Sequence, residues 1–362
     1  MLKLGLVGLP NAGKSTLFNA LTAGRAATAP YPFTTIDQNI GVARVADPRL
    51  DALAQRLSPE RVIPTSLECV DIAGLVKGAH QGDGLGNQFL SHIFGVDALL
   101  HVVRCFEDRN VAHPVGELDP LRDVEIVNTE LLLKDLEILD RRAQREQKLA
   151  KGGDKQAAAL LSHIERWRAA ISGGTAIRRA ELAPEAHPAA WGIDLLSAKP
   201  VLYAANVGEG MEPSAPAVVA LRRLAEQEGA AMVTCSAKLE AELAELDPED
   251  RIAMMQELGL TSSALPQVIQ RSYALLRLIT FFTTTSGIVQ AWTVRQGTKA
   301  PQAAGAIHTD FERQFIRAEV IQTDTLLRCG SEAAARAQGL LRLEGKEYIV
   351  RDGDVIHFRI GT

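Results

Sequence analysis

The first part of the chain alternates short apolar runs with polar loops. The runs at residues 4–7, 67–70, 98–103 and 201–205 are apolar at almost every position, which is typical of strands buried on both faces of a sheet. Helix-like segments lie between them. We therefore expect an α/β fold with a mostly parallel sheet covered on both faces, and ligands bound at the C-terminal ends of the strands.

A helical repeat interrupts this alternation. Apolar residues recur at 4-3-4 spacing before and after the Gly152-Gly153-Asp154 turn. This spacing predicts an antiparallel helical hairpin, inserted at residues 126–196 into a sheet domain at 1–125 and 197–277. The repeating positions are Leu132, Leu136, Leu139, Ala143, Leu160, Ile164, Trp167 and Ile171.

The last part of the chain is rich in segments whose residues favour β-strands. We expect strands at residues 280–284, 288–292, 348–350 and 355–358, with a helix-like stretch around 309–317. This pattern predicts a small separate α+β domain at 278–362.

A phosphate-binding motif follows the first strand. The sequence GLPNAGKS fits GxxxxGK(S/T), and it opens a helix-like segment as that motif requires. The glycines turn backbone N–H groups toward a phosphate, the lysine neutralises β/γ oxygens, and the serine hydroxyl ligates Mg²⁺. A chance glycine-rich turn is the alternative, which the strand and helix context disfavours. The candidates are Asn11, Ala12, Gly13, Lys14, Ser15 and Thr16.

Two further segments suit Mg²⁺ and the γ-phosphate. Asp71 and Gly74 form DIAG at the end of an apolar strand, where the carboxylate reaches the metal and the glycine N–H meets the γ-phosphate. Thr35, in YPFTT, is expected to ligate Mg²⁺ only when the γ-phosphate is present. An ordinary turn with a buried aromatic remains the alternative for that segment. Ser15, Thr35 and Asp71 are thus the predicted metal ligands.

The base-binding motif departs from the guanine-specific pattern. NVGE at residues 206–209 stands where guanine-specific relatives carry NKxD, so Val207 replaces lysine and Glu209 replaces aspartate. The extra methylene displaces the carboxylate beyond hydrogen-bonding tolerance for guanine, which favours adenine. Asn206 and Ser236 are the other candidate base-binding residues, the latter through backbone contacts in TCSAK at 234–238.

The residue after DIAG does not supply a water-orienting side chain. Leu75 follows DIAG, where Ras-like enzymes place a water-orienting glutamine, and leucine cannot hydrogen-bond water. His113 is a candidate catalytic residue beside Lys14 and Gly74, although the sequence alone favours a structural role for a lone loop histidine. The Asn11 side-chain oxygen is a candidate contact for a monovalent cation such as K⁺.

Composition limits partners and location. A net charge of -5 and a pI near 6.0 argue against a globally basic nucleic-acid binder, so RNA contact would be regional. The expected hairpin tip carries six basic and three acidic residues, which suits either a solvated face or a phosphate-backbone contact. The tip residues are Arg141, Arg142, Arg145, Lys148, Lys151 and Lys155, with Asp140, Glu146 and Asp154.

Cysteine spacing and hydropathy point to the cytoplasm. The cysteines form no CxxC pair or metal-ligand spacing, which excludes a disulfide framework or a zinc site on this pattern. The sequence contains no run of about 18 apolar residues, so no membrane-spanning helix is predicted. The cysteines are Cys69, Cys105, Cys235 and Cys329.

These motifs together resemble the YchF type of Obg-like ATPase, within the translation-factor-related P-loop NTPases. The matching text is GLPNAGKST, YPFTTI, DIAGLVKGA, GDGLGNQFL and NVGE, in that order over nearly the whole chain. The C-terminal part resembles a TGS domain, a β-grasp fold related to that of ubiquitin. His80-Gln81 departs from the family pattern.

The resemblance implies Mg²⁺-dependent hydrolysis of ATP in preference to GTP, and association with the ribosome or its large subunit through the hairpin and TGS-like domain. It also implies that residues 11–16 contact phosphates, that Ser15 and Thr35 bind Mg²⁺, that Asn206 and Val207 contact adenine, and that His113 is the candidate catalytic histidine. Neither a membrane nor a specific DNA sequence is an expected partner. Two alternatives stay open: a nucleotide-gated binding module with incidental hydrolysis, and a GTPase of ribosome assembly.

Overall fold

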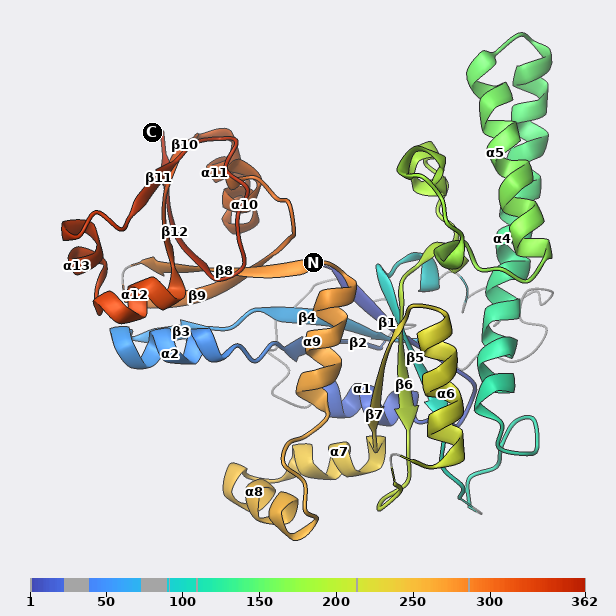
Figure 1. Ribbon diagram of the computed structural model, residues 1–362, viewed down its shortest axis with the longest axis horizontal. Coiled ribbons are helices and arrows are strands. Elements are labelled where there is room, and N and C mark those ends of the chain that lie inside the picture. Colours follow the sequence, from blue (N-terminus) through green and yellow to red (C-terminus); the bar gives the residue numbers. More distant parts are fainter. Residues whose placement is uncertain are drawn as a thin grey trace. The chain divides into compact units, whose positions relative to one another are not determined.

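The chain is organised as two compact units (Figure 1). Unit 1 comprises Met1–Val42 and Glu68–Ser272, and unit 2 comprises Ala43–Leu67 and Tyr273–Thr362. The computed structural model describes residues 2–22, 39–72, 90, 92–108, 110–212, 214–285 and 287–361.

Unit 1 contains a six-stranded sheet in the order β2-β4-β1-β5-β6-β7. The registered pairs β4–β1, β1–β5, β5–β6 and β6–β7 are all parallel, which confirms the predicted sheet. β5 and β6 are buried along their whole length, as their largely apolar sequences require. The strands are β1 (Lys3–Val7), β2 (Asn39–Arg44), β4 (Ser66–Asp71), β5 (Ala98–Arg104), β6 (Val201–Asn206) and β7 (Ala231–Cys235).

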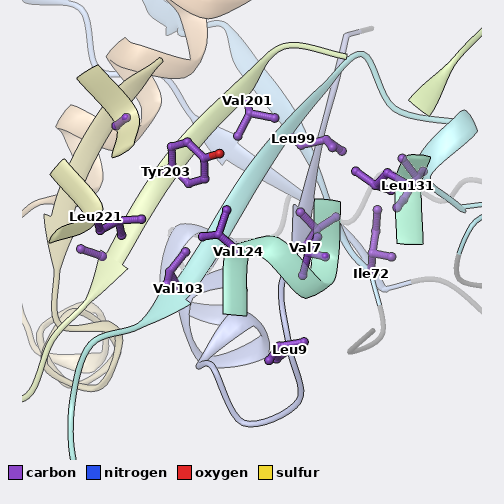
Figure 2. Packing of buried hydrophobic residues seen from close by; sticks show 14 of the residues in the cluster. Val7, Leu9, Ile72, Leu99, Val103, Val124, Leu131, Val201, Tyr203 and Leu221 are labelled. Carbon is purple, nitrogen blue, oxygen red and sulfur yellow. The ribbon is translucent and has the colours of Figure 1, made fainter. Parts of the chain in front are cut away.

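Helices cover this sheet and complete its core. Tyr203 on β6 packs with Leu221 on α6 and with Val124 and Leu131 on α4 (Pro120–Lys151) in one buried cluster (Figure 2). The same cluster includes Val7, directly before the phosphate-binding motif, so the motif starts from a rigid strand end. The helices of this part are α1 (Lys14–Thr22), α6 (Pro216–Gln227), α7 (Ala237–Glu245), α8 (Pro248–Glu257) and α9 (Leu265–Leu275).

The predicted helical hairpin is formed by α4 (Pro120–Lys151) and α5 (Lys155–Ser172), which run side by side (Figure 1). Asp119 and Asp154 cap the helix N-termini through their carboxylates. The repeating apolar residues form one buried cluster along the hairpin, which confirms the spacing argument. Short 3₁₀ helices return the chain to the sheet at Ile177–Arg179, Pro184–Ala186, Pro188–Trp191 and Leu196–Ala198.

A buried carboxylate fixes that return. Asp135 of α4 accepts hydrogen bonds from the backbone N–H groups of Leu196 at 2.7 Å and Ser197 at 2.8 Å. Burial raises the pKa of Asp135 to about 6, although these donors oppose the shift.

Unit 2 contains a second six-stranded sheet, in the order β11-β10-β12-β8-β9-β3. β8 and β12 are parallel neighbours, while β9 and β10 pair antiparallel with them from either side. With α10 packed on this sheet, this is a β-grasp arrangement. The elements are α2 (Pro48–Leu57), β3 (Arg61–Ile63), β8 (Leu278–Thr285), β9 (Ile288–Arg295), α10 (Ala300–Ile307), α11 (Thr309–Arg313), β10 (Phe315–Gln322), α12 (Thr323–Cys329), α13 (Glu332–Ala337), β11 (Arg342–Glu344) and β12 (Asp354–Ile360).

The structure differs from the sequence-based expectations in unit 2. Residues 43–67, expected in the nucleotide-binding domain, pack here because β3 pairs with β9, and Leu50 and Leu53 of α2 join the cluster around Phe282. The strand expected at 348–350 is only an isolated bridge between Ile349 and Lys299. Among the described residues, no helix is long and apolar enough to span a membrane.

Candidate nucleotide-binding site

The phosphate-binding loop joins β1 to α1 with a backbone that requires glycine at two positions. Gly8 has φ +150° and Gly13 has φ +93°, and both conformations are strained for any other residue. A Cβ on Gly8 would overlap the carbonyl oxygen of Val102, and one on Gly13 would overlap Nδ2 of Asn206. Asn11 also has a positive φ, 63°, which asparagine tolerates better than most residues.

Lys14 lies inside this loop. It is buried, and its Nζ donates a hydrogen bond to the carbonyl oxygen of Leu9 at 2.9 Å. Burial lowers the pKa of Lys14 to about 8, while the Asp71 carboxylate acts in the opposite direction. An ammonium held in this way gains most from an incoming phosphate, whose charge replaces lost hydration.

Asp71 and Ser15 suit a magnesium ion shared with phosphates. Oδ1 of Asp71 is buried and, in the described part of the chain, has no hydrogen-bond partner. Ser15 is exposed in the first turn of α1. The described residues contain no group of three or more His, Cys, Asp or Glu that would hold a metal unaided. A hard cation with mainly phosphate and water ligands fits this donor set. Thr35, Gly74 and Leu75 lie outside the described residues.

A cavity of about 470 Å³ lies where the base is expected. Asn206 organises it: Nδ2 donates to the carbonyl of Ala12 at 2.8 Å, and Oδ1 accepts from the N–H of Ala237 at 2.9 Å. This residue therefore ties the phosphate loop to the first residue of α7. The cavity is lined by Gly13, Thr16, Phe106, Glu107, Asp108, Val111, Asn206, Val207, Gly208, Glu209, Ser236, Ala237 and Lys238.

Glu209 faces a cation within the same lining. Its Oε1 lies 2.8 Å from Nζ of Lys238, and both side chains are largely exposed. Lys238 also lies 3.8 Å from Glu242, one turn along α7. The Glu209 carboxylate thus has a partner within the protein.

His113 stands in a loop tied to the phosphate-binding motif. Nδ2 of Asn11 donates to the carbonyl of Ala112 at 3.0 Å. The His113 ring is buried, and its Nε2 lies 3.0 Å from Oδ2 of Asp123 on α4. Burial raises the pKa of Asp123, and the hydrogen bond from His113 opposes this shift.

Two residues of this site were not predicted from the sequence. Asp123 carries no motif, and its role depends on α4 passing the His113 loop. Arg104 ends an apolar strand, yet it donates to the carbonyls of Phe106 and Val111 at 3.2 and 2.9 Å and so shapes the same loop. The sequence did contain a signal for Arg104, because an arginine at the end of an apolar strand and immediately before a polar loop is unusual. The structure shows that this arginine is buried.

Two family models match the chain. One, described as "50S ribosome-binding GTPase", matches residues 3–139, and the other, YchF-GTPase_C, described as a protein of unknown function, matches 278–361. The "Ribosome-binding ATPase YchF" of Haemophilus ducreyi is 50% identical over 99% of both chains. This chain belongs to the YchF family.

Other YchF relatives agree over the full length. The protein of the same name from Bacillus subtilis is 48% identical over 100% of both chains, and chicken "Obg-like ATPase 1" is 42% identical over 100% of this chain and 93% of its own. The solved Schizosaccharomyces pombe YchF GTPase superposes with a TM-score of 0.88 at 36% identity, over 99% of this YchF-family chain and 97% of that one. The P-loop NTPase fold predicted from the sequence is confirmed.

Proposed function

We propose that this protein is a Mg²⁺-dependent ATPase that binds the ribosome and changes that association with its nucleotide state. The observation that carries the adenine preference is the pairing of Glu209 with Lys238, because a guanine-specific site needs a free carboxylate in that place. The names of the relatives, ribosome-binding ATPase and Obg-like ATPase, support the same reaction and partner.

The phosphate loop binds the triphosphate tail. Backbone N–H groups of residues 11–16 surround the phosphates, and Lys14 moves its ammonium from the Leu9 carbonyl to the β/γ oxygens. Ser15, Asp71 and Thr35 are the residues that would hold Mg²⁺. When bound, this ion neutralises charge that develops on the phosphates during hydrolysis.

The base-binding end selects through shape and backbone contacts. Asn206 fixes the spacing between the phosphate loop and the residues after β7, while Val207 and Ser236 line the cavity beside it. The adenine amine then meets backbone acceptors rather than a carboxylate.

Hydrolysis requires a group that positions water. Leu75 cannot do this through its side chain. We propose His113 for this role because its loop is held next to the phosphate motif by Asn11. The Asn11 side-chain oxygen would contact K⁺ when that cation assists the reaction.

The helical hairpin is the proposed contact with ribosomal RNA. Ion pairs engage Arg141 with Glu137 and Arg142 with Glu146. The remaining basic residues of the tip are exposed and suited to phosphate contacts: Arg145, Lys148, Lys151 and Lys155. The TGS-like part of unit 2 is a second proposed contact, and the cytoplasm is the proposed location.

Turnover measured with and without 70S ribosomes tests this proposal. ATP hydrolysis should be slow alone and rise with ribosomes, with a further difference between sodium and potassium buffers. Lys14→Ala should abolish both rates. If ribosomes change nothing in either salt, the hydrolysis is incidental and the switch role is wrong.

A GTPase role is the second candidate, because the matching N-terminal model and the fission yeast relative are both described as GTPases. The ratio of kcat/KM for ATP and GTP separates the two. A ratio below one would favour the GTPase assignment.

A further inference from the structure

His113 is held at both of its ring nitrogens. Nδ1 accepts a hydrogen bond from the backbone N–H of Val115 at 3.3 Å, and Nε2 lies 3.0 Å from Oδ2 of Asp123. Since Nδ1 is the acceptor, Nε2 carries the proton and donates it to the carboxylate. The two side chains are 6% and 4% exposed. In this arrangement neither nitrogen can accept a hydrogen bond from an attacking water.

Asp123 depends on this contact. Its other oxygen, Oδ1, is buried and has no hydrogen-bond partner within the described chain. Burial raises the pKa of Asp123, whereas the His113 hydrogen bond lowers it. If His113 left, the carboxylate would stay buried without that donor, which is unfavourable. The pair therefore holds the imidazole firmly.

The rest of the loop is fixed by other groups. Arg104 Nη2 donates to the Val111 carbonyl at 2.9 Å, and Asn11 Nδ2 donates to the Ala112 carbonyl at 3.0 Å. Beyond His113, Gly116 has φ +96°, and a Cβ there would meet no atom within 4 Å. The loop backbone therefore stays attached to the phosphate motif when the His113 imidazole leaves Asp123. Gly116, on the other side of His113, allows the backbone dihedral angles to change.

Asp123 belongs to the helix that builds the hairpin. It stands in the first turn of α4, whose other end reaches the basic tip. Because α4 is one continuous helix of 32 residues, a displacement of the hairpin can reach its first turn.

We propose that Asp123 is a positioning residue that holds His113 away from water in the free protein, and that displacement of the first turn of α4 releases it. This inference rests on the proposed function, in which His113 positions water for ATP hydrolysis. It makes the hairpin and the catalytic loop two ends of one two-state element.

The rate of ATP turnover by Asp123→Asn without ribosomes tests whether Asp123 keeps His113 away from water. Asparagine keeps the size of the side chain but removes the charge that strengthens the hydrogen bond. Turnover without ribosomes should rise about tenfold, and the stimulation by ribosomes should shrink accordingly. Glu125→Gln, an exposed acid of the neighbouring turn, should leave both rates unchanged. An unchanged or lower basal rate in Asp123→Asn would overturn the proposal, the lower rate by showing that Asp123 orients an active histidine.

Histidine ¹⁵N NMR supplies a readout independent of turnover. The His113 signal, assigned by its loss in His113→Gln, should show a fixed Nε2–H tautomer in the wild-type protein and tautomer averaging in Asp123→Asn. A tautomer that stays fixed in the variant would contradict the hold. An unchanged circular dichroism spectrum and ATP affinity would show that the variant is folded.

The double variant separates the two claims. With ribosomes present, Asp123→Asn with His113→Ala should turn over as slowly as His113→Ala alone, about 100-fold below wild type. If His113→Ala hydrolyses ATP normally, the water-positioning role proposed for His113 fails, whatever the NMR shows of the hold. If no variant hydrolyses ATP with or without ribosomes, the ATPase assignment itself fails.

Discussion

Asn206 occupies the space that a side chain on Gly13 would need. Its Nδ2 donates to the carbonyl of Ala12 at 2.8 Å, so the amide lies directly against the phosphate loop. Because Oδ1 also accepts from Ala237 at 2.9 Å, one side chain sets the distance between the phosphate and base ends of the site. The asparagine of the base motif is therefore as much a part of the phosphate loop as of the base pocket.

Gly13→Ala should damage both the loop and its partner. The φ of +93° and the overlap with Asn206 together should reduce the free energy of unfolding by about 1–3 kcal/mol and abolish tight ATP binding. Urea unfolding and calorimetric ATP titration would measure the two effects. Gly153→Ala, at a similar φ with open space around it, is the matched control and should retain ATP affinity. Wild-type affinity in Gly13→Ala would refute the steric argument.

Asn206→Ala should weaken the same site without strain. It leaves the N–H of Ala237 and the carbonyl of Ala12 without their partner, which should lower stability by about 1–3 kcal/mol and ATP affinity at least tenfold. Asn19→Ala, an exposed position on α1, serves as the control. Equal ATP affinities in both variants would show that Asn206 is dispensable.

Nucleotide binding should take up a proton above pH 8. The pKa of Lys14 is lowered to about 8 by burial, and an adjacent triphosphate must raise it, so at pH 9 binding converts a largely neutral amine into an ammonium ion. ATP affinity should consequently fall as the pH rises through 8. Calorimetry at pH 9 in buffers of different ionisation enthalpy would measure the uptake. Lys14→Arg, which stays charged, should show none if it still binds, and equal uptake in that variant would assign the proton elsewhere.

Asp135 should be the strongest single polar contact between the hairpin and the returning chain. Asp135→Ala removes the acceptor of two buried N–H groups, at 2.7 and 2.8 Å, and should lower the free energy of unfolding by about 2–4 kcal/mol. Glu137→Ala, which breaks only partly exposed ion pairs on the same helix, should change it by less than about 1 kcal/mol. Urea unfolding followed by tryptophan fluorescence would compare them, and similar midpoints would rule out the anchoring role.

Much of the fold could be predicted from strong local patterns of apolar residues. The strand at residues 98–103 and the hairpin repeat were predicted because burial on both faces, or along one helical stripe, leaves a mark on consecutive residues. β3 left no such mark: it is three residues long, partly exposed, and owes its place to pairing with β9. Its assignment to unit 2 was therefore beyond sequence reasoning.

The site divides in the same way. The phosphate loop was predictable because its chemistry requires residues at fixed spacing, and Asp71 because it ends a strand. Two contacts could not be predicted in this way: the two hydrogen bonds of Asn206 and the contact between His113 and Asp123. Each joins separate elements that meet only in the folded chain, so no residue spacing indicates it. The roles of Thr35 and Gly74 remain predictions.

ATP binding should not depend on the Glu209–Lys238 ion pair as a direct contact with the nucleotide. Because Glu209 and Lys238 are largely exposed, Glu209→Ala should change ATP affinity by less than about threefold to fivefold. Fluorescence titration with a labelled ATP analogue would measure it. A loss of a hundredfold would mean that the carboxylate contacts the base directly.

Affinities for ATP and GTP, measured by calorimetry in magnesium buffer on the full chain, test the central claim most directly. ATP should bind with measurable heat and more tightly than GTP, and Lys14→Ala should abolish the heat. A tenfold preference for GTP, about 1.4 kcal/mol, or no heat with either nucleotide, would contradict the account.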